Sequence, residues 1–350
     1  MGYRRKLRIV IGIFKDKASL IKTTLSTKSH ASSIRRVIIR ATSHGAPALT
    51  SDNRIAAVLS LGQGSRATAS ACIQALMDRL HGTKNATVAL KCLYAVHNVI
   101  AKGSFILKDQ LSVYPSSGGR NFLNMSRFRD DSDHENWEIS SWVRWYAGAL
   151  EQNLMVSRLL GHYLCSPPGA KDDDKRGKVS VLSNLDILND VDVLVGFVEQ
   201  IGNVPESLHL RRNSLVFEAV RLVGEDYRSV QREISIRVGE LGERMVSLSG
   251  GELIQFLSCL KRTEDCKEKL SSLFGNRKMN EELWELIRET KINLEEMMEE
   301  KRKGNMPAIM EDNSGELTRF GRQLRSASGG GWLSTNRMPL TVSTVGSRFE

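Results

Sequence analysis

Apolar residues recur at every third or fourth position along most of the chain, and this period constrains its fold more than any other feature. The stripe in the first such segment consists of Leu7, Val10, Ile11, Phe14, Ala18, Ile21 and Leu25. Strand-type alternation is also present over residues 7–13, but it stops at Phe14, whereas the helical stripe continues. The pattern therefore favours a helix at this end and predicts an all-α fold for the chain.

The same period, together with cap residues, places further helices. Stripes over residues 31–43 and 52–61 each predict a helix, and Ser65 predicts the N-cap of the next one. A long helix is expected to begin near Ser140, and the last helix is expected over residues 279–303. About ten helices result. Because no repeat of fixed length is visible, we expect them to stack irregularly.

Two segments lack the helical period. Residues 165–178 contain a Pro-Pro pair and mixed charges, which predicts a solvent-exposed loop. After residue 303 the composition changes to Gly, Ser, Thr and Arg without periodicity. We therefore expect a helical domain over residues 1–303 and a disordered tail over residues 304–350.

Sequence motifs for catalysis and metal binding are missing. No Walker, HExxH or GxSxG pattern occurs, and His97 falls on an apolar helix face, which is typical of a core histidine. The five cysteines are widely spaced within mostly apolar helical patterns: Cys72, Cys92, Cys165, Cys259 and Cys266. We expect them to be reduced core residues rather than metal ligands. We expect no enzyme, no cofactor and no membrane-spanning helix, since no run of eighteen apolar residues occurs.

Basic residues are concentrated at the N-terminus. The first forty residues contain eleven Lys and Arg and one acid, Asp16, so this segment alone carries a surplus of ten positive charges. The whole chain, with fifty bases and forty acids, carries the same +10. An anionic membrane, a nucleic acid or an acidic protein could each attract such a segment.

The composition of the N-terminal segment favours one of these three kinds of partner. Proteins that bind single-stranded nucleic acid present aromatic side chains for base stacking, and here only Tyr3 and Phe14 are aromatic. An apolar stripe flanked by cations is typical of an amphipathic helix at a membrane surface. Those cations include Lys6, Lys15 and Lys22 and, as the expected membrane-facing residues, Arg4, Arg5 and Arg8. A membrane surface is the leading interpretation, with no nucleic-acid partner. The alternative is a helical scaffold whose basic end binds an acidic protein or RNA.

Several ordered blocks resemble a known family. "IIRATSH", "ALKCLYAVHNVIAKG", "SSWVRWYAGALEQNL", "SLVFEAVRLVGEDYRSVQREISIRVGELGERM" and "LIQFLSCLKR" follow one another as in the ANTH domain of clathrin-assembly proteins, especially those of plants. The resemblance covers about residues 3–275. It implies an irregular right-handed superhelix of helices, phosphoinositide and clathrin as partners, and a location at coated pits and vesicles or the Golgi, on the cytosolic face of the membrane. It also implies a site for vesicle SNARE helices near Leu253, Phe256 and Leu257, although we expect these residues to belong to the core.

The headgroup signature of that family is incomplete in this sequence. In "RATSHGAPALTSDNR", Arg40 takes the place of the first lysine, but Thr50, Asp52 and Asn53 take the places of two lysines and a histidine. Two cations are lost and one anion is gained, so we expect a diffuse patch in place of a specific pocket. Arg36 and Arg40 lie one turn apart, and arginine binds phosphate well. The full set of expected phosphoinositide-binding residues is Lys15, Lys22, Lys28, Arg36, Arg40 and His44.

Overall fold

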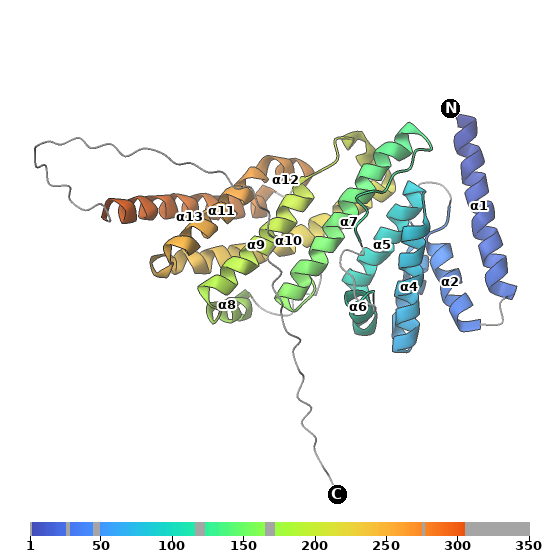
Figure 1. The fold of residues 1–350 in the computed structure, drawn as a ribbon, viewed down its shortest axis with the longest axis horizontal. Helices are drawn as coiled ribbons and strands as arrows, with labels where there is room; N and C mark the ends of the chain where they lie inside the picture. The colour runs from blue at the N-terminus through green and yellow to red at the C-terminus, as the bar shows by residue number, and fades with distance from the viewer. Residues whose placement is uncertain are drawn as a thin grey trace, which may run out of the picture. The chain divides into compact units, whose positions relative to one another are not determined.

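The computed structural model describes residues 2–25, 29–44, 50–115, 123–164, 172–274 and 277–304, and the regular structure in these ranges is entirely helical (Figure 1). The α-helices are α1 (Gly2–Leu25), α2 (Ser29–Ala41), α3 (Asp52–Ser60), α4 (Arg66–Gly82), α5 (Ala86–Lys102), α6 (Phe105–Ser112), α7 (His134–Leu160), α8 (Asp172–Ser180), α9 (Asn184–Gly202), α10 (Ser214–Glu243), α11 (Gly250–Asp265), α12 (Lys267–Leu273) and α13 (Arg277–Gly304). Three short 3₁₀ helices are η1 (Leu61–Gln63), η2 (Leu208–Arg212) and η3 (Met245–Ser247). The prediction of an all-α fold is confirmed.

The helices pack progressively along the chain. α1 lies against α2, α2 against α4, α5 against α7, α7 against α9, and α9 against both α10 and α11, after which α13 packs on α10 and α11. One apolar cluster extends without interruption from α2 to α13. Its largest fully buried side chains include Trp142, Tyr146, Phe197 and Tyr227. Neighbouring helices therefore share a single interior.

Side-chain caps fix where several helices begin. Ser65 accepts a hydrogen bond from the backbone N–H of Thr68, as predicted, and so caps α4. α7 begins at His134, six residues earlier than the expected start near Ser140. The carboxylate of Asp133 accepts the backbone N–H of Asn136 at 2.8 Å and satisfies a donor that the first turn leaves open. This cap lies outside the apolar stripe, so the period alone placed the start too late.

The expectation of a loop over residues 165–178 is wrong for its second half. Residues 172–180 form α8, which packs on α10. Val179 is buried in the common core, and Lys175 Nζ donates to Glu233 Oε1 at 2.8 Å. Arg244 of the segment after α10 also donates to the carbonyl oxygen of Ser180, the last residue of α8. None of these described contacts produces an apolar period. α13 ends at Gly304, and the residues that follow it lie outside the described part of the chain, so the predicted boundary between the domain and the tail stays a prediction.

The buried side chains of the described part show neither a reactive thiol nor a metal cluster. Cys72, Cys92, Cys259 and Cys266 are buried and free, as predicted, while Cys165 lies outside the described residues. Burial raises the pKa of the Cys72 and Cys92 thiols to about 12. No three His, Cys, Asp or Glu residues of the described ranges gather as metal ligands would, and no helix there combines the length and apolar character needed to cross a bilayer.

Candidate functional site

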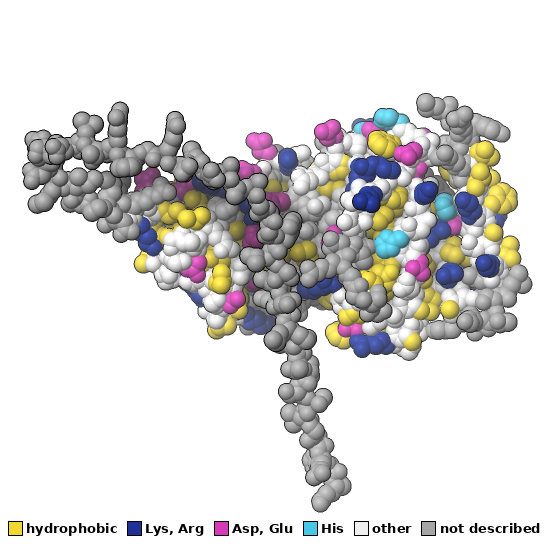
Figure 2. Space-filling view, viewed as in Figure 1, with side chains coloured by type: hydrophobic (Ala, Val, Ile, Leu, Met, Phe, Trp, Pro, Cys, Tyr) yellow, Lys and Arg dark blue, Asp and Glu magenta, His cyan; other side chains and the backbone are white. Residues whose placement is uncertain are grey.

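The first helix presents an apolar ridge to solvent. The ridge is formed by side chains that retain between 44% and 66% exposure, namely Leu7, Val10, Ile11, Phe14 and Ile21. Figure 2 shows hydrophobic side chains along the edge that α1 occupies, with Lys and Arg side chains beside them. Lys15, Lys17 and Lys22 are exposed on the same helix. The predicted amphipathic stripe therefore faces outward, not into the helical stack.

A different face of α1 contacts the rest of the molecule. Gly12 and Asp16 are buried on that face, and Ile9, Ile13 and Leu20 are half-buried. Among the described side chains of α1, none belongs to the apolar cluster that joins α2 to α13. A Cβ on Gly12 would lie 2.5 Å from His44 Cδ2, so glycine allows α1 to approach this closely. α1 is packed on the stack without sharing its core.

Asp16 makes the polar contacts of this face. Its Oδ2 accepts the backbone N–H of His44 at 2.7 Å and lies 2.9 Å from His44 Nδ1. Its Oδ1 accepts a hydrogen bond from Arg79 Nη2 of α4 at 2.7 Å. The same guanidinium donates to the carbonyl oxygen of Thr42 at 3.2 Å. One carboxylate thus joins α1 to the segment after α2 and to α4.

The ionisation of Asp16 follows from these contacts. Burial alone would raise the pKa of its carboxyl, but the two hydrogen bonds from His44 and the positive charge of Arg79 outweigh it, so the pKa lies below its ordinary value of 3.8. Asp16 is therefore a carboxylate at neutral pH. The only acid among the first forty residues is used internally.

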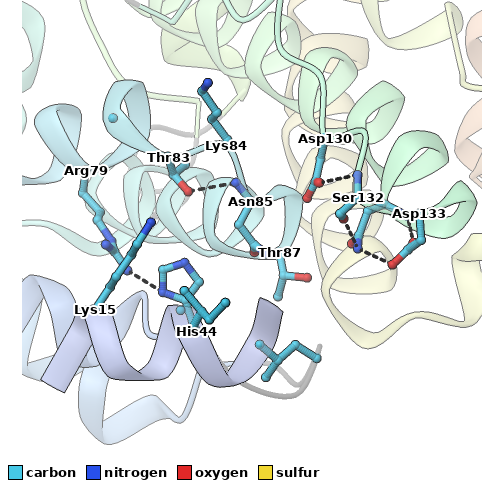
Figure 3. Close-up of a pocket in the computed structure, with 15 residues that line it drawn as sticks. Lys15, His44, Arg79, Thr83, Lys84, Asn85, Thr87, Asp130, Ser132 and Asp133 are labelled. Carbon is cyan, nitrogen blue, oxygen red and sulfur yellow. Dashed lines mark hydrogen bonds between the residues drawn. The ribbon is translucent and has the colours of Figure 1, made fainter. Parts of the chain in front are cut away.

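Two of the expected phosphoinositide-binding residues, Lys15 and His44, line one cavity of about 600 Å³ between α1, α4 and the start of α7 (Figure 3). Arg79 and Lys84 also line it. Lys15 and Lys84 make no hydrogen bond or ion pair with other described residues. The acids that line this cavity accept hydrogen bonds from backbone groups and do not pair with these lysines. Asp130 accepts the N–H of Ala86 at 2.8 Å, and Asp133 caps α7.

The remaining expected residues lie elsewhere. Lys22 lines a second cavity, of about 650 Å³, together with Arg35 and the apolar side chains of Ile38 and Ile39. Arg40 is exposed and Arg36 is half-buried on α2, and neither lines either cavity. The structure therefore separates the five described residues of the predicted set of six into three places.

Four predicted cations cannot be placed. Lys28 lies outside the described residues. Arg4, Arg5 and Arg8 are part of the α1 helix, but their side chains lie outside the described part of the structure. Their proposed contact with a membrane stays a prediction.

Sequence reasoning missed three cations that hold the C-terminal end of α2 and the segment after it. Arg79 donates to the carbonyl oxygen of Thr42, Lys91 to that of Ser43 at 3.1 Å, and Arg54 to that of Arg40 at 3.1 Å. Burial lowers the pKa of Lys91, and the charge of Arg54 adds to the effect. Periodicity alone would place Lys91 on the side opposite the apolar stripe. The signal that could have revealed this cluster is that "ALKCLYAV" is apolar on nearly every side, since a helix of that kind is buried all round.

Comparison with known proteins identifies the fold family. Residues 33–280 match the family described as the ANTH domain. The chain belongs to this family. It is 42% identical over 298 residues to the "Putative clathrin assembly protein At4g40080" of Arabidopsis thaliana, covering 83% of this chain and 82% of that protein. It is 30% identical over 297 residues to the Arabidopsis protein of the same description At5g10410, covering 82% and 85%.

The ANTH match begins within α2, so the ridge and Asp16 lie before it. Within the ANTH domain, the departures from the headgroup signature have structural roles or face solvent. Thr50 is buried and its Oγ1 donates to the carbonyl oxygen of Ala41 at 2.8 Å. Asp52 and Asn53 are exposed in the first turn of α3. A carboxylate is therefore presented to solvent where the signature has a lysine.

The residues considered for SNARE binding belong mainly to the interior of the ANTH domain. Leu253 and Phe256 are fully buried, and Leu257 is half-buried against the same core. The interpretation of these side chains as core residues is confirmed. In this conformation they offer little surface to a partner helix.

Proposed function

We propose that this chain is a non-catalytic peripheral adaptor that binds the cytosolic face of anionic membranes and helps to assemble clathrin coats, at coated pits and vesicles. The observation that carries the proposal is the exposed apolar ridge of α1 beside lysines that no described acid neutralises. Acyl chains can accept such a ridge while anionic headgroups attract the cations. The descriptions of the similar Arabidopsis proteins support the part that concerns clathrin.

We further propose that recognition of phosphoinositides is diffuse. Lys15, Lys22 and Arg40 lie in separate places and face solvent, and Asp52 is exposed close in sequence to Arg40. Point charges spread over a surface respond to the total charge of a membrane more than to the arrangement of phosphates on one headgroup. Phosphatidylserine at matched surface charge should therefore replace much of the effect of a phosphoinositide.

Liposome co-sedimentation tests the membrane proposal. We expect the full chain to bind vesicles that contain phosphatidylserine or phosphoinositide, to ignore neutral phosphatidylcholine vesicles, and to dissociate as salt rises. Competing RNA should not displace it. Absence of binding to anionic vesicles at low ionic strength, or displacement by RNA, would overturn the proposal and favour the scaffold alternative.

A double variant tests the contribution of α2. Arg36→Gln with Arg40→Gln should weaken binding to anionic vesicles by about tenfold, since each base near an anionic leaflet contributes up to about 1 kcal/mol. The matched control is Arg176→Gln with Arg232→Gln, which removes two exposed arginines of α8 and α10. Equal losses of vesicle affinity in the two double variants would mean that the net charge of the chain sets the affinity. Such a result would contradict a specific contribution of α2. A strict preference for one phosphoinositide that survives Arg36→Gln with Arg40→Gln would contradict diffuse recognition.

Clathrin binding is tested separately. Purified clathrin cages should co-sediment the full chain at physiological salt without any lipid. Failure of this experiment would overturn the coat-assembly part and leave the membrane part standing.

A further inference from the structure

We infer that Asp16 is a positioning residue that keeps α1 folded and docked before a membrane is met, so that removing its negative charge weakens membrane binding instead of strengthening it. The inference rests on the proposed function and concerns how the ridge of α1 is held.

The groups around the Asp16 carboxylate form a preformed binding site for an anion. A carboxylate of α1 receives a backbone N–H, faces an imidazole nitrogen and receives a guanidinium N–H, at 2.7, 2.9 and 2.7 Å. Hydrogen bonds to an ionised acceptor are about twice as strong as neutral ones. All three partners belong to the body of the molecule: His44 follows α2, and Arg79 is in α4.

Other described contacts of α1 are weak by comparison. Its inward apolar residues, Ile9, Ile13 and Leu20, are only half-buried, and none joins the common core. The close approach at Gly12 places the backbone of α1 against the His44 ring but adds no apolar side chain of α1 to the contact. The side chains of the outward ridge are between 44% and 66% exposed, so they bury less apolar surface than core side chains do. Asp16 is therefore the strongest described attachment of α1.

An undocked α1 would not remain a stable helix in water. Its sequence contains Gly12 and several β-branched residues, and its many cations repel one another along the axis. Helix formation has a costly nucleus, and most helical stability in proteins comes from packing. If only about a tenth of the molecules kept α1 helical, the apparent membrane affinity would fall about tenfold.

A positioning role of Asp16 and simple electrostatic attraction predict opposite changes of vesicle affinity for the substitution Asp16→Asn. Asp16→Asn raises the net charge by one, so attraction to an anionic vesicle alone would tighten binding slightly. Loss of docking would instead weaken binding by about tenfold. Arg79→Gln lowers the net charge by one and removes the partner in α4. Docking predicts that these two variants, with opposite changes of charge, have the same effect.

Two measurements on the full chain test this. The first is hydrogen–deuterium exchange without lipid: the amides of α1 should exchange at least tenfold faster in Asp16→Asn and in Arg79→Gln than in the wild type. The second is affinity for phosphatidylserine vesicles, which should fall about tenfold in both. Asp265→Asn, which removes an exposed acid at the end of α11, is the charge-matched control; it should leave the exchange of α1 unchanged and should at most tighten vesicle binding slightly.

The outcomes separate this inference from the proposed function. Tighter vesicle binding by Asp16→Asn, or unchanged exchange in α1, would overturn the positioning role while leaving the membrane adaptor intact. Faster exchange in both variants, together with a wild type that ignores vesicles, would support docking by Asp16 and overturn the adaptor. Because α1 lies outside the common core, we expect Asp16→Asn to keep the wild-type thermal midpoint, which shows that its loss is local. Arg79→Gln also removes the hydrogen bond to the Thr42 carbonyl, so we expect a lower midpoint for that variant.

Discussion

Phe14→Glu should reduce the affinity of the chain for anionic vesicles by about a hundredfold. Phe14 is the most exposed ridge residue, at 66%. Full burial of such a side chain in an apolar medium contributes about 1.5–3 kcal/mol, and a carboxylate in its place is repelled by acidic headgroups as well. Vesicle co-sedimentation over a range of lipid concentrations measures the change.

Phe105→Glu is the matched control for this substitution. Phe105 is 80% exposed and begins α6, away from α1. We expect this variant to bind vesicles as the wild type does, apart from a small effect of its charge. Equal losses in the two variants, or an unaffected Phe14→Glu, would mean that the ridge does not enter the membrane.

The second large effect concerns folding. Glu233→Gln in α10 should lower the free energy of unfolding by about 3–5 kcal/mol, the range observed when one partner of a buried ion pair is removed. Glu233 is only 3% exposed and accepts from Lys175 Nζ at 2.8 Å and from Arg237 Nη1 at 2.6 Å. Without its charge, the buried guanidinium of Arg237 keeps only Asp190, at 3.0 Å, as a described ionic partner. Urea denaturation measures the difference.

The difference in the free energy of unfolding between the wild type and Glu233→Gln should become smaller as the pH falls. Burial raises the pKa of Glu233, but hydrogen bonds from His162, Lys175 and Arg237 outweigh it and hold the pKa well below its ordinary value of 4.5. A depressed folded-state pKa means that the stabilisation is fully present above about pH 4.5 and is lost as the pH falls through the folded-state value. Wild type and variant should therefore approach equal stability in strong acid.

Glu225→Gln on the same helix provides the comparison. Glu225 pairs with Arg221, but both side chains are more than 40% exposed, so the change should be within about 1 kcal/mol. If Glu233→Gln lowered the free energy of unfolding by as little as Glu225→Gln does, the stabilising role of the buried ion pairs of Glu233 would be refuted. A Glu233→Gln variant with the pH dependence of the wild type would do the same.

Much of the fold was predictable because apolar period and caps are local properties. The helix over residues 7–25, the cap at Ser65 and the buried Leu253 and Phe256 follow from residues a few positions apart. α8 was missed because its attachment depends on Glu233, far away in the sequence. Local composition described it correctly as charged and could not reveal its partner.

The site was harder to predict for a related reason. Periodicity identifies an amphipathic stripe but not whether that stripe faces the core or solvent. For α1, the deciding contact joins Asp16 to Arg79, sixty-three residues later in the chain. Of the predicted cations that the structure describes, Lys15, Lys22 and Arg40 are exposed, and Arg36 and His44 are half-buried. Their division between two cavities and α2 depends on how α1, α2 and α4 pack, and their role in binding stays a prediction.

A helix that stands outside the common interior leaves natural selection unusual freedom. Most substitutions in a protein lower its stability, and those in a core do so most. Changes on the outer side of α1 escape that penalty, because no described side chain there supports the packing of α2 to α13. Avidity for one kind of bilayer or another could thus drift or be tuned among descendants of this chain by exchanging a few outward side chains, with no compensating repair elsewhere in the protein.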